Sequence, residues 1–143
     1  MKGDNAVKIK KIALLVLSLG ALTLEALPYG AVLSFGGPNG EVWRYTYSYF
    51  SPVPTGYANF GPILTALLTC ALLVMTAVDV FRYTVGLNTA VKYISGAAAL
   101  ISLSPVLYGI NHFSFVGAAI TLILAAVCGV SFIKDKKQKE DAE

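Results

Sequence analysis

The stretch GPILTALLTCALLVMTAVDV, residues 61–80, decides the fold class, because it is a long apolar run with a single charged residue, Asp79. About 20 apolar residues in a helix cross the ~30 Å hydrocarbon core of a bilayer. Three further apolar blocks flank it, at residues 12–33, 91–108 and 113–133. We therefore predict an all-α membrane protein, a single domain built as a bundle of four transmembrane helices.

The composition also favours a bilayer over water as the solvent. The chain is 56% hydrophobic and only 13% charged, against about 25% charged residues in an average soluble protein. An alternative is a signal peptide over the first block, with Lys8, Lys10 and Lys11 before its apolar core, which would leave three spans. Glu25 would then lie just before the cleavage site, and no small-x-small site is visible. We expect an uncleaved first span.

The positions of the basic residues predict the topology. Of the 11 Lys and Arg residues, only Arg44 lies in the loop after the first block. The others lie at the chain ends or between the second and third blocks, where the positive-inside rule places the cytoplasm. We predict a multi-pass protein of the cell membrane with both termini cytoplasmic, a cytoplasmic tail at 134–143 and an outer loop at 36–60.

The outer loop has a strand pattern, because Trp43, Tyr45, Tyr47 and Tyr49 alternate with polar residues. Aromatic residues at period two are typical of a β-strand. We predict a short extracellular β segment, Trp43–Tyr49, paired as a hairpin or lying across the mouth of the bundle. The alternation suggests an outer recognition surface of Trp43, Arg44, Tyr45, Tyr47 and Tyr49. The alternative is an aromatic belt at the membrane interface.

Glu25 is the candidate functional residue inside the membrane. It lies 13 residues after Ile12, hence about 20 Å along the helix, where a carboxylate is costly unless it is protonated, paired or hydrated. Thr69, Ser102 and Thr121 lie at a similar depth. We expect Glu25 to point into the bundle and to bond one of these hydroxyls or a carbonyl freed by Pro28 or Pro105. The alternatives are a structural buried group or a side chain that snorkels to the surface.

Two further patterns predict contacts between and along helices. In the last block the small residues Gly117, Thr121, Ala125 and Gly129 recur every four positions, a spacing that lets helices pack closely. Asp79 and Arg82 have the i,i+3 spacing of an ion pair at a helix end.

The residues that could carry metal or covalent chemistry are few and scattered. Cys70, Cys128 and His112 form no CxxC or metal-ligand spacing, and no Gly-rich phosphate loop is present. We expect no catalytic residues, metal or cofactor, and no nucleic-acid partner. The expected partners are the lipid bilayer and another membrane protein or a second copy of the chain. The sequence identifies no ligand.

Three short motifs, LPYGA (27–31), YSYFS (47–51) and GYANFGP (56–62), carry a resemblance to a known group. They resemble small bacterial four-span membrane proteins that have no assigned function, over the first half of the chain. The resemblance implies a bacterial cell membrane and no particular activity. A glutamate in the first of four spans is similar to small multidrug-resistance transporters, although those have short loops. The long first loop with a strand is similar in architecture to claudin-like proteins, whose Trp and paired-Cys motif is absent.

Three classes of function remain open, and an enzyme is the least favoured of them, because the sequence offers no nucleophile–base pair or metal-ligand set. The first, which we favour, is a non-enzymatic accessory or interaction protein that uses its aromatic outer loop. The alternative is a proton-coupled small-molecule transporter that uses Glu25.

Overall fold

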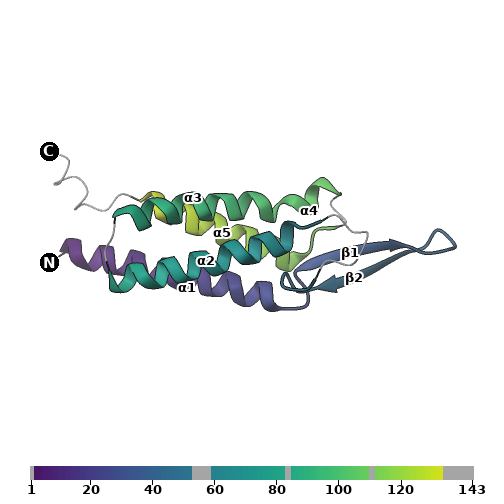
Figure 1. The fold of residues 1–143 in the computed structure, drawn as a ribbon, viewed down its shortest axis with the longest axis horizontal. Coiled ribbons are helices and arrows are strands. Elements are labelled where there is room, and N and C mark those ends of the chain that lie inside the picture. The colour runs from purple at the N-terminus through teal and green to yellow at the C-terminus, as the bar shows by residue number, and fades with distance from the viewer. Residues whose placement is uncertain (1, 53–58, 83–84, 110–111, 134–143) are drawn as a thin grey trace.

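The computed structural model describes residues 2–52, 59–82, 85–109 and 112–133, so the tail at 134–143 and part of the outer loop lie outside the described residues. The described chain is mostly helical, with one small two-stranded sheet at one end of the helices (Figure 1). In chain order the elements are α1 (Lys2–Ala26), β1 (Ala31–Gly36), β2 (Val42–Tyr47), α2 (Gly61–Phe81), α3 (Val85–Ser102), α4 (Ser104–Leu107) and α5 (Phe115–Phe132).

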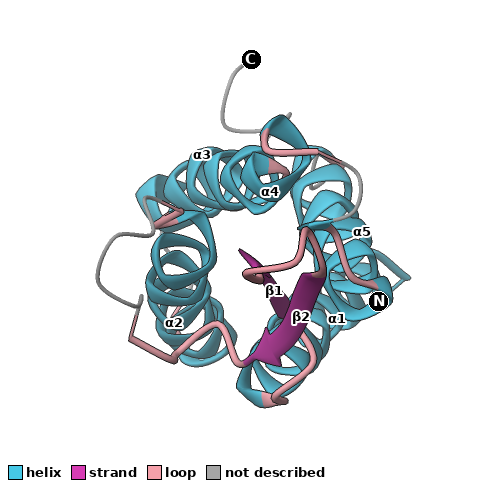
Figure 2. Cartoon of the chain, turned by 90° about the vertical axis from the view of Figure 1, so that its right-hand side faces the viewer, coloured by secondary structure: helices cyan, strands magenta, loops and turns pink. Residues whose placement is uncertain are grey.

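The four long helices form a ring, seen end-on in Figure 2. Helix α1 packs against α2 and α5, and α3 packs against the other sides of the same two helices. The short α4 extends α3 toward the sheet, with Pro105 in its first turn, where a missing N–H costs nothing. We call the end that carries the sheet the hairpin end, and the end where the chain begins the terminal end.

Three segments are long and apolar enough to cross a membrane: Gly61–Phe81, Gly86–Leu107 and Phe115–Phe132. They correspond to the second, third and fourth apolar blocks, although the third begins several residues earlier than the predicted Val91. Helix α1 is not among them, because it combines Lys10 and Lys11 with Glu25 over its apolar part.

We predicted that the first apolar block forms one helix to Leu33, and this prediction is wrong. Helix α1 ends at Ala26, and residues 31–36 form strand β1. The physical reason is Pro28, which has no backbone N–H to donate to Leu24 and blocks a further helical turn. The N–H of Leu27 donates instead to the Leu24 carbonyl, at 3.2 Å, and closes the helix.

The strand predicted in the outer loop is present, and it forms a hairpin. Strand β2 pairs antiparallel with β1, so that Phe35 lies opposite Trp43 and Leu33 opposite Tyr45. The turn is closed by hydrogen bonds from Gly37 to Glu41 and from Gly40 to Gly37, and Gly40 has a positive φ of 78°. The observed strand ends at Tyr47, two residues before the predicted end.

The core of the bundle contains both apolar and hydroxyl-bearing side chains. Leu14, Leu72, Leu124 and Val127 are buried there, together with a set of polar side chains. Ser18, Thr65, Thr76 and Ser131 each donate to the carbonyl four residues earlier in their own helix. This back-bonding satisfies the hydroxyl within its helix, so these four side chains need no partner on another helix.

Candidate functional site

Glu25 lies in the last turn of α1, at the hairpin end of the bundle, and its side chain is completely buried. The Thr69 hydroxyl on α2 donates to Glu25 Oε1 at 2.8 Å. The predicted contact between Glu25 and a hydroxyl of another helix is therefore confirmed. The other carboxylate oxygen, Oε2, has no hydrogen-bond partner among the described residues.

The other two hydroxyls predicted for this site bond each other instead. The hydroxyl oxygens of Ser102 and Thr121 lie 2.9 Å apart, and each is also within hydrogen-bond distance of a carbonyl of its own helix. This pair joins α3 to α5, just as Glu25 and Thr69 join α1 to α2. The structure thus divides the predicted set of four residues into two pairs.

Tyr49 closes the site from the hairpin side. Only 1% of it is exposed, and its backbone N–H donates to the Glu25 carbonyl at 2.9 Å. Burial raises the pKa of the Tyr49 phenol above its ordinary value, and the charge of the Glu25 carboxylate raises it further. The phenol is therefore neutral at ordinary pH. Its hydroxyl has no hydrogen-bond partner among the described residues.

The assignment of Tyr49 to the outer recognition surface is wrong. The alternation of aromatic residues continues to Tyr49, but β2 ends at Tyr47 and the chain then turns inward. Two glycines make room for the ring and its hydroxyl. A Cβ on Gly30 would lie 2.9 Å from a Tyr49 ring carbon, and one on Gly117 would lie 3.4 Å from the hydroxyl.

The base of the hairpin is also tied to α5. Ser114, the N-cap of α5, donates its hydroxyl to the Gly30 carbonyl at 2.6 Å and accepts from Gly117. Ala31 forms an antiparallel bridge with Phe113. The base of the hairpin is therefore held against α5 by these contacts and against α1 by the hydrogen bond from Tyr49 to Glu25.

One face of the hairpin is exposed and aromatic. Directly opposed residues of an antiparallel pair project on the same face, so Phe35 and Trp43 share a face with Leu33 and Tyr45. Phe35, Trp43 and Tyr45 are 37%, 51% and 48% exposed. The rings of Phe35 and Tyr45 pack edge to face, with 6.1 Å between their centroids. We call these three residues the aromatic face.

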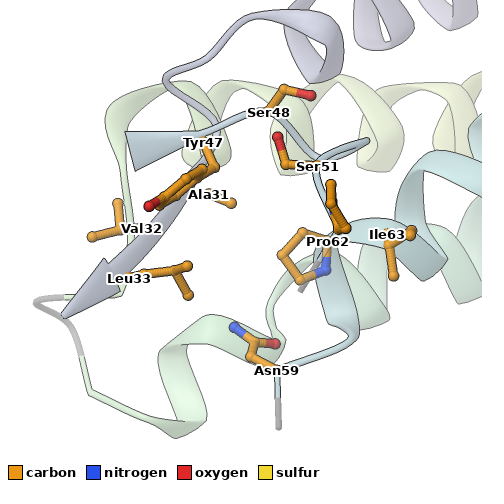
Figure 3. Close-up of a pocket in the computed structure, with 10 residues that line it drawn as sticks. Ala31, Val32, Leu33, Tyr47, Ser48, Ser51, Asn59, Pro62 and Ile63 are labelled. Carbon is orange, nitrogen blue, oxygen red and sulfur yellow. The ribbon is translucent and has the colours of Figure 1, made fainter. Parts of the chain in front are cut away.

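The other predicted members of the recognition surface lie elsewhere on the hairpin. Arg44 is on the opposite face, where its guanidinium donates to the Phe113 carbonyl at 3.3 Å. Tyr47 is half-buried at the base of the hairpin. It lines a small pocket of about 30 Å³ together with Leu33, Asn59 and Pro62 (Figure 3). A volume of this size holds water rather than an organic ligand.

A charged contact that the sequence did not predict lies at the terminal end. Lys11 of α1 donates to the Asp79 carbonyl of α2, and its ammonium is 3.4 Å from Asp79 Oδ1. Lys10 donates to the Ile133 carbonyl at 2.6 Å. The predicted pairing of Asp79 with Arg82 is wrong, because Asp79 is buried toward α1 whereas Arg82 is exposed at the C-cap of α2.

The stripe of small residues on α5 packs only at its hairpin end. Gly117 is buried and Thr121 half-buried, whereas Ala125 and Gly129 are exposed. A Cβ on Gly129 would meet nothing within 4 Å. The prediction of a continuous packing stripe is therefore wrong for its second half within this chain.

The comparisons with known proteins identify no relative. No protein-family model matches the chain, and neither the curated proteins nor the solved structures include a match. The functional argument accordingly rests on the geometry of the chain itself.

Proposed function

We propose that this chain is a four-span protein of the cell membrane, with α1 as the fourth span and both termini in the cytoplasm. Its place in the ring between α2 and α5 supports this assignment. The outward face of α1 is apolar, with Ile12, Val16 and Leu19 each more than half exposed, as a lipid-facing surface requires. Lys10, which is buried, and Lys11, which is half-buried, lie at the terminal end, where their charges reach the interface.

We further propose that the chain is a non-enzymatic interaction protein that presents its hairpin to another protein outside the membrane. The observation that carries this proposal is the exposure of the aromatic face. Tyr and Trp are enriched in protein interfaces because a large apolar ring also carries a polar atom. An exposed cluster of them on a hairpin is a typical docking surface.

The position of the hairpin favours a protein partner over lipid. It continues along the long axis of the bundle, away from the helices (Figure 1). Phe35 and its partner Trp43 lie four residues beyond Ala31 at the base, which is about 14 Å at about 3.4 Å per residue. The headgroup layer adds only about 5–7 Å beyond the hydrocarbon core. The tip of the aromatic face therefore extends past an interfacial belt.

Site-specific photo-crosslinking in intact cells tests this function. A photoreactive phenylalanine at Trp43 or Tyr45 should give one discrete protein adduct. The same residue at Thr46, which is exposed on the opposite face, is the matched control and should give little adduct. An adduct of twice the chain mass would identify a second copy as the partner. Equal adducts from both faces, or lipid adducts only, would rule out a specific docking surface.

A second candidate function is proton-coupled transport of a small molecule through Glu25. A completely buried carboxylate with one unpartnered oxygen favours it, because such groups often mark proton and ion pathways in membranes. In reconstituted vesicles with an imposed pH gradient, wild-type protein should accumulate a small organic cation. Glu25→Gln should fold normally and not accumulate it. Equal uptake by both proteins would exclude the mechanism.

A further inference from the structure

Thr69 has more hydrogen-bond acceptors around it than it has hydrogens. Its hydroxyl oxygen lies 2.8 Å from Glu25 Oε1 and 3.0 Å from the Thr65 carbonyl oxygen. A threonine hydroxyl carries one hydrogen and two lone pairs. It can therefore donate to the carboxyl group or to the carbonyl, but not to both at once.

Each of the two choices fits one protonation state of Glu25. When Glu25 is ionised, Thr69 donates to Oε1 and stabilises the negative charge. When Glu25 carries a proton on Oε1, this O–H group donates a hydrogen bond to the Thr69 hydroxyl oxygen. The Thr69 hydroxyl then donates its own hydrogen bond to the Thr65 carbonyl. The heavy atoms stay in place while one hydrogen rotates. Both states of the pair are thus hydrogen-bonded at the same geometry.

Among the residues that the structure describes, none places a cation beside Glu25 that would keep it ionised. Among the described residues, the titratable group that faces it is the neutral Tyr49 phenol. Helix α5 has no charged residue between Phe115 and Phe132. On α2 the charged residue is Asp79, ten positions from Thr69 and therefore about 15 Å away along the helix. Lys92 of α3 and Lys11 of α1 also lie toward the terminal end.

We propose that Glu25 is a reversible proton-binding site in which Thr69 accommodates both the charged and the neutral carboxyl group. The proton comes from water: the carboxylate takes it from hydronium and becomes a carboxylic acid, and water is released. Tyr49 covers the site from the hairpin side, and the unpartnered Glu25 Oε2 gives the proton a second carboxyl oxygen on which to rest. The site does not depend on hairpin docking, and it would exist even if no substrate were transported.

Infrared difference spectroscopy on the purified full chain in lipid vesicles tests this proposal. Lowering the pH should produce the C=O stretching band of a protonated, buried carboxylic acid. Glu25→Gln should remove the band, whereas Asp79→Asn should leave it, because Asp79 is the other carboxyl group that is buried among the described residues. Thermal unfolding of each variant confirms that it is folded.

Variants at Thr69 test the specific role of the hydroxyl. Thr69→Ser keeps a donor and acceptor and should leave the band at its wild-type frequency. Thr69→Val has a similar shape without the oxygen, so the carboxylic acid loses its acceptor and its band should move to higher frequency. A band that is absent in wild type, or that survives Glu25→Gln, would overturn proton binding at Glu25. An unshifted band in Thr69→Val would overturn the hydrogen-bond exchange. None of these outcomes bears on the docking surface, whose test is the crosslinking above.

Discussion

At the scale of single residues, the hairpin end depends on how closely Tyr49 approaches the backbone. The ring occupies space that a side chain on residue 30 would need, since a Cβ there would lie 2.9 and 3.0 Å from two ring carbons. The backbone N–H of Tyr49 is simultaneously held by the Glu25 carbonyl. The backbone of Tyr49 is thus fixed and its ring is buried, so the ring has little room to move away from a side chain at position 30.

Gly30→Ala should therefore destabilise the protein. Forcing one methyl group into a packed site costs about 1–3 kcal/mol. Gly36→Ala, at the far end of the adjoining strand β1, is the control, because a Cβ there meets nothing within 4 Å. Its effect should stay within about 0.5 kcal/mol. The measurement is the free energy of unfolding in detergent micelles. Equal effects of the two substitutions would show that Tyr49 does not pack against residue 30 in solution.

At the scale of elements, the apolar blocks at 61–80 and 113–133 predicted α2 and α5 closely, because burial in a bilayer leaves a long and simple signal. The aromatic alternation similarly predicted β2. The sequence could not predict β1, because the apolar run Ala31, Val32 and Leu33 is compatible with either a helix or a strand. Pro28 and the pairing with β2 decide between the two, and that pairing joins residues that no local pattern connects.

The candidate site was predictable only where depth along the helices determined it. Counting residues along each helix placed Glu25 and Thr69 at a similar depth in the membrane, and the structure places their side chains in contact. This counting could not tell that Ser102 and Thr121 pair with each other, because rotation about each helix axis is set by packing. Tyr49 was assigned to the wrong surface because its alternation with Trp43 and Tyr45 is local, whereas its contacts with Gly30 and Gly117 are not.

The contact between Lys11 of α1 and Asp79 of α2, which we call the clamp, gives a prediction that concerns both helices. The side chains of Lys11 and Asp79 are only 13% and 12% exposed, so their interaction is screened less than a surface ion pair. In a double-mutant cycle, Lys11→Met and Asp79→Asn should show a coupling energy between about 0.5 and 3 kcal/mol.

The control is a second double-mutant cycle that uses Lys8 in place of Lys11, because Lys8 is exposed on the same helix. Lys8→Met and Asp79→Asn should be additive within about 0.5 kcal/mol. Chemical unfolding in micelles measures all the variants. Additivity in the Lys11 cycle as well would contradict the clamp and leave Asp79 free to pair elsewhere.

At the scale of the whole molecule, the bundle is closed at both ends by contacts of different kinds. Tyr49 and the hairpin base cover the Glu25 end, and the Lys11–Asp79 pair joins α1 to α2 at the other. Buried hydroxyls lie between these ends, most of them satisfied within their own helices. A proton held at Glu25 is therefore close to the hairpin end and far from the terminal end.

The distribution of basic residues predicts the direction of the bundle in the membrane, and gene fusions can measure it. Asn39 lies in the turn of the hairpin. An alkaline phosphatase domain inserted there should be active, because the enzyme requires an oxidising compartment outside the cytoplasm. The same domain after Glu143 should be inactive, whereas a fluorescent protein at that position should fluoresce. Phosphatase activity at Glu143, or none at Asn39, would contradict the proposed orientation.

The number of spans follows from a third fusion, because the first two fix only the direction of α2, α3 and α5. Those three helices put Asn39 and Glu143 on opposite sides whether or not α1 crosses the membrane. A fluorescent protein before Met1 decides the question, since a cytoplasmic N-terminus and an external hairpin can be joined only if α1 crosses. We expect fluorescence from a fusion of full-length mass. Loss of the tag from the membrane fraction would instead indicate cleavage of α1, and with it Glu25 could no longer be held in the mature bundle.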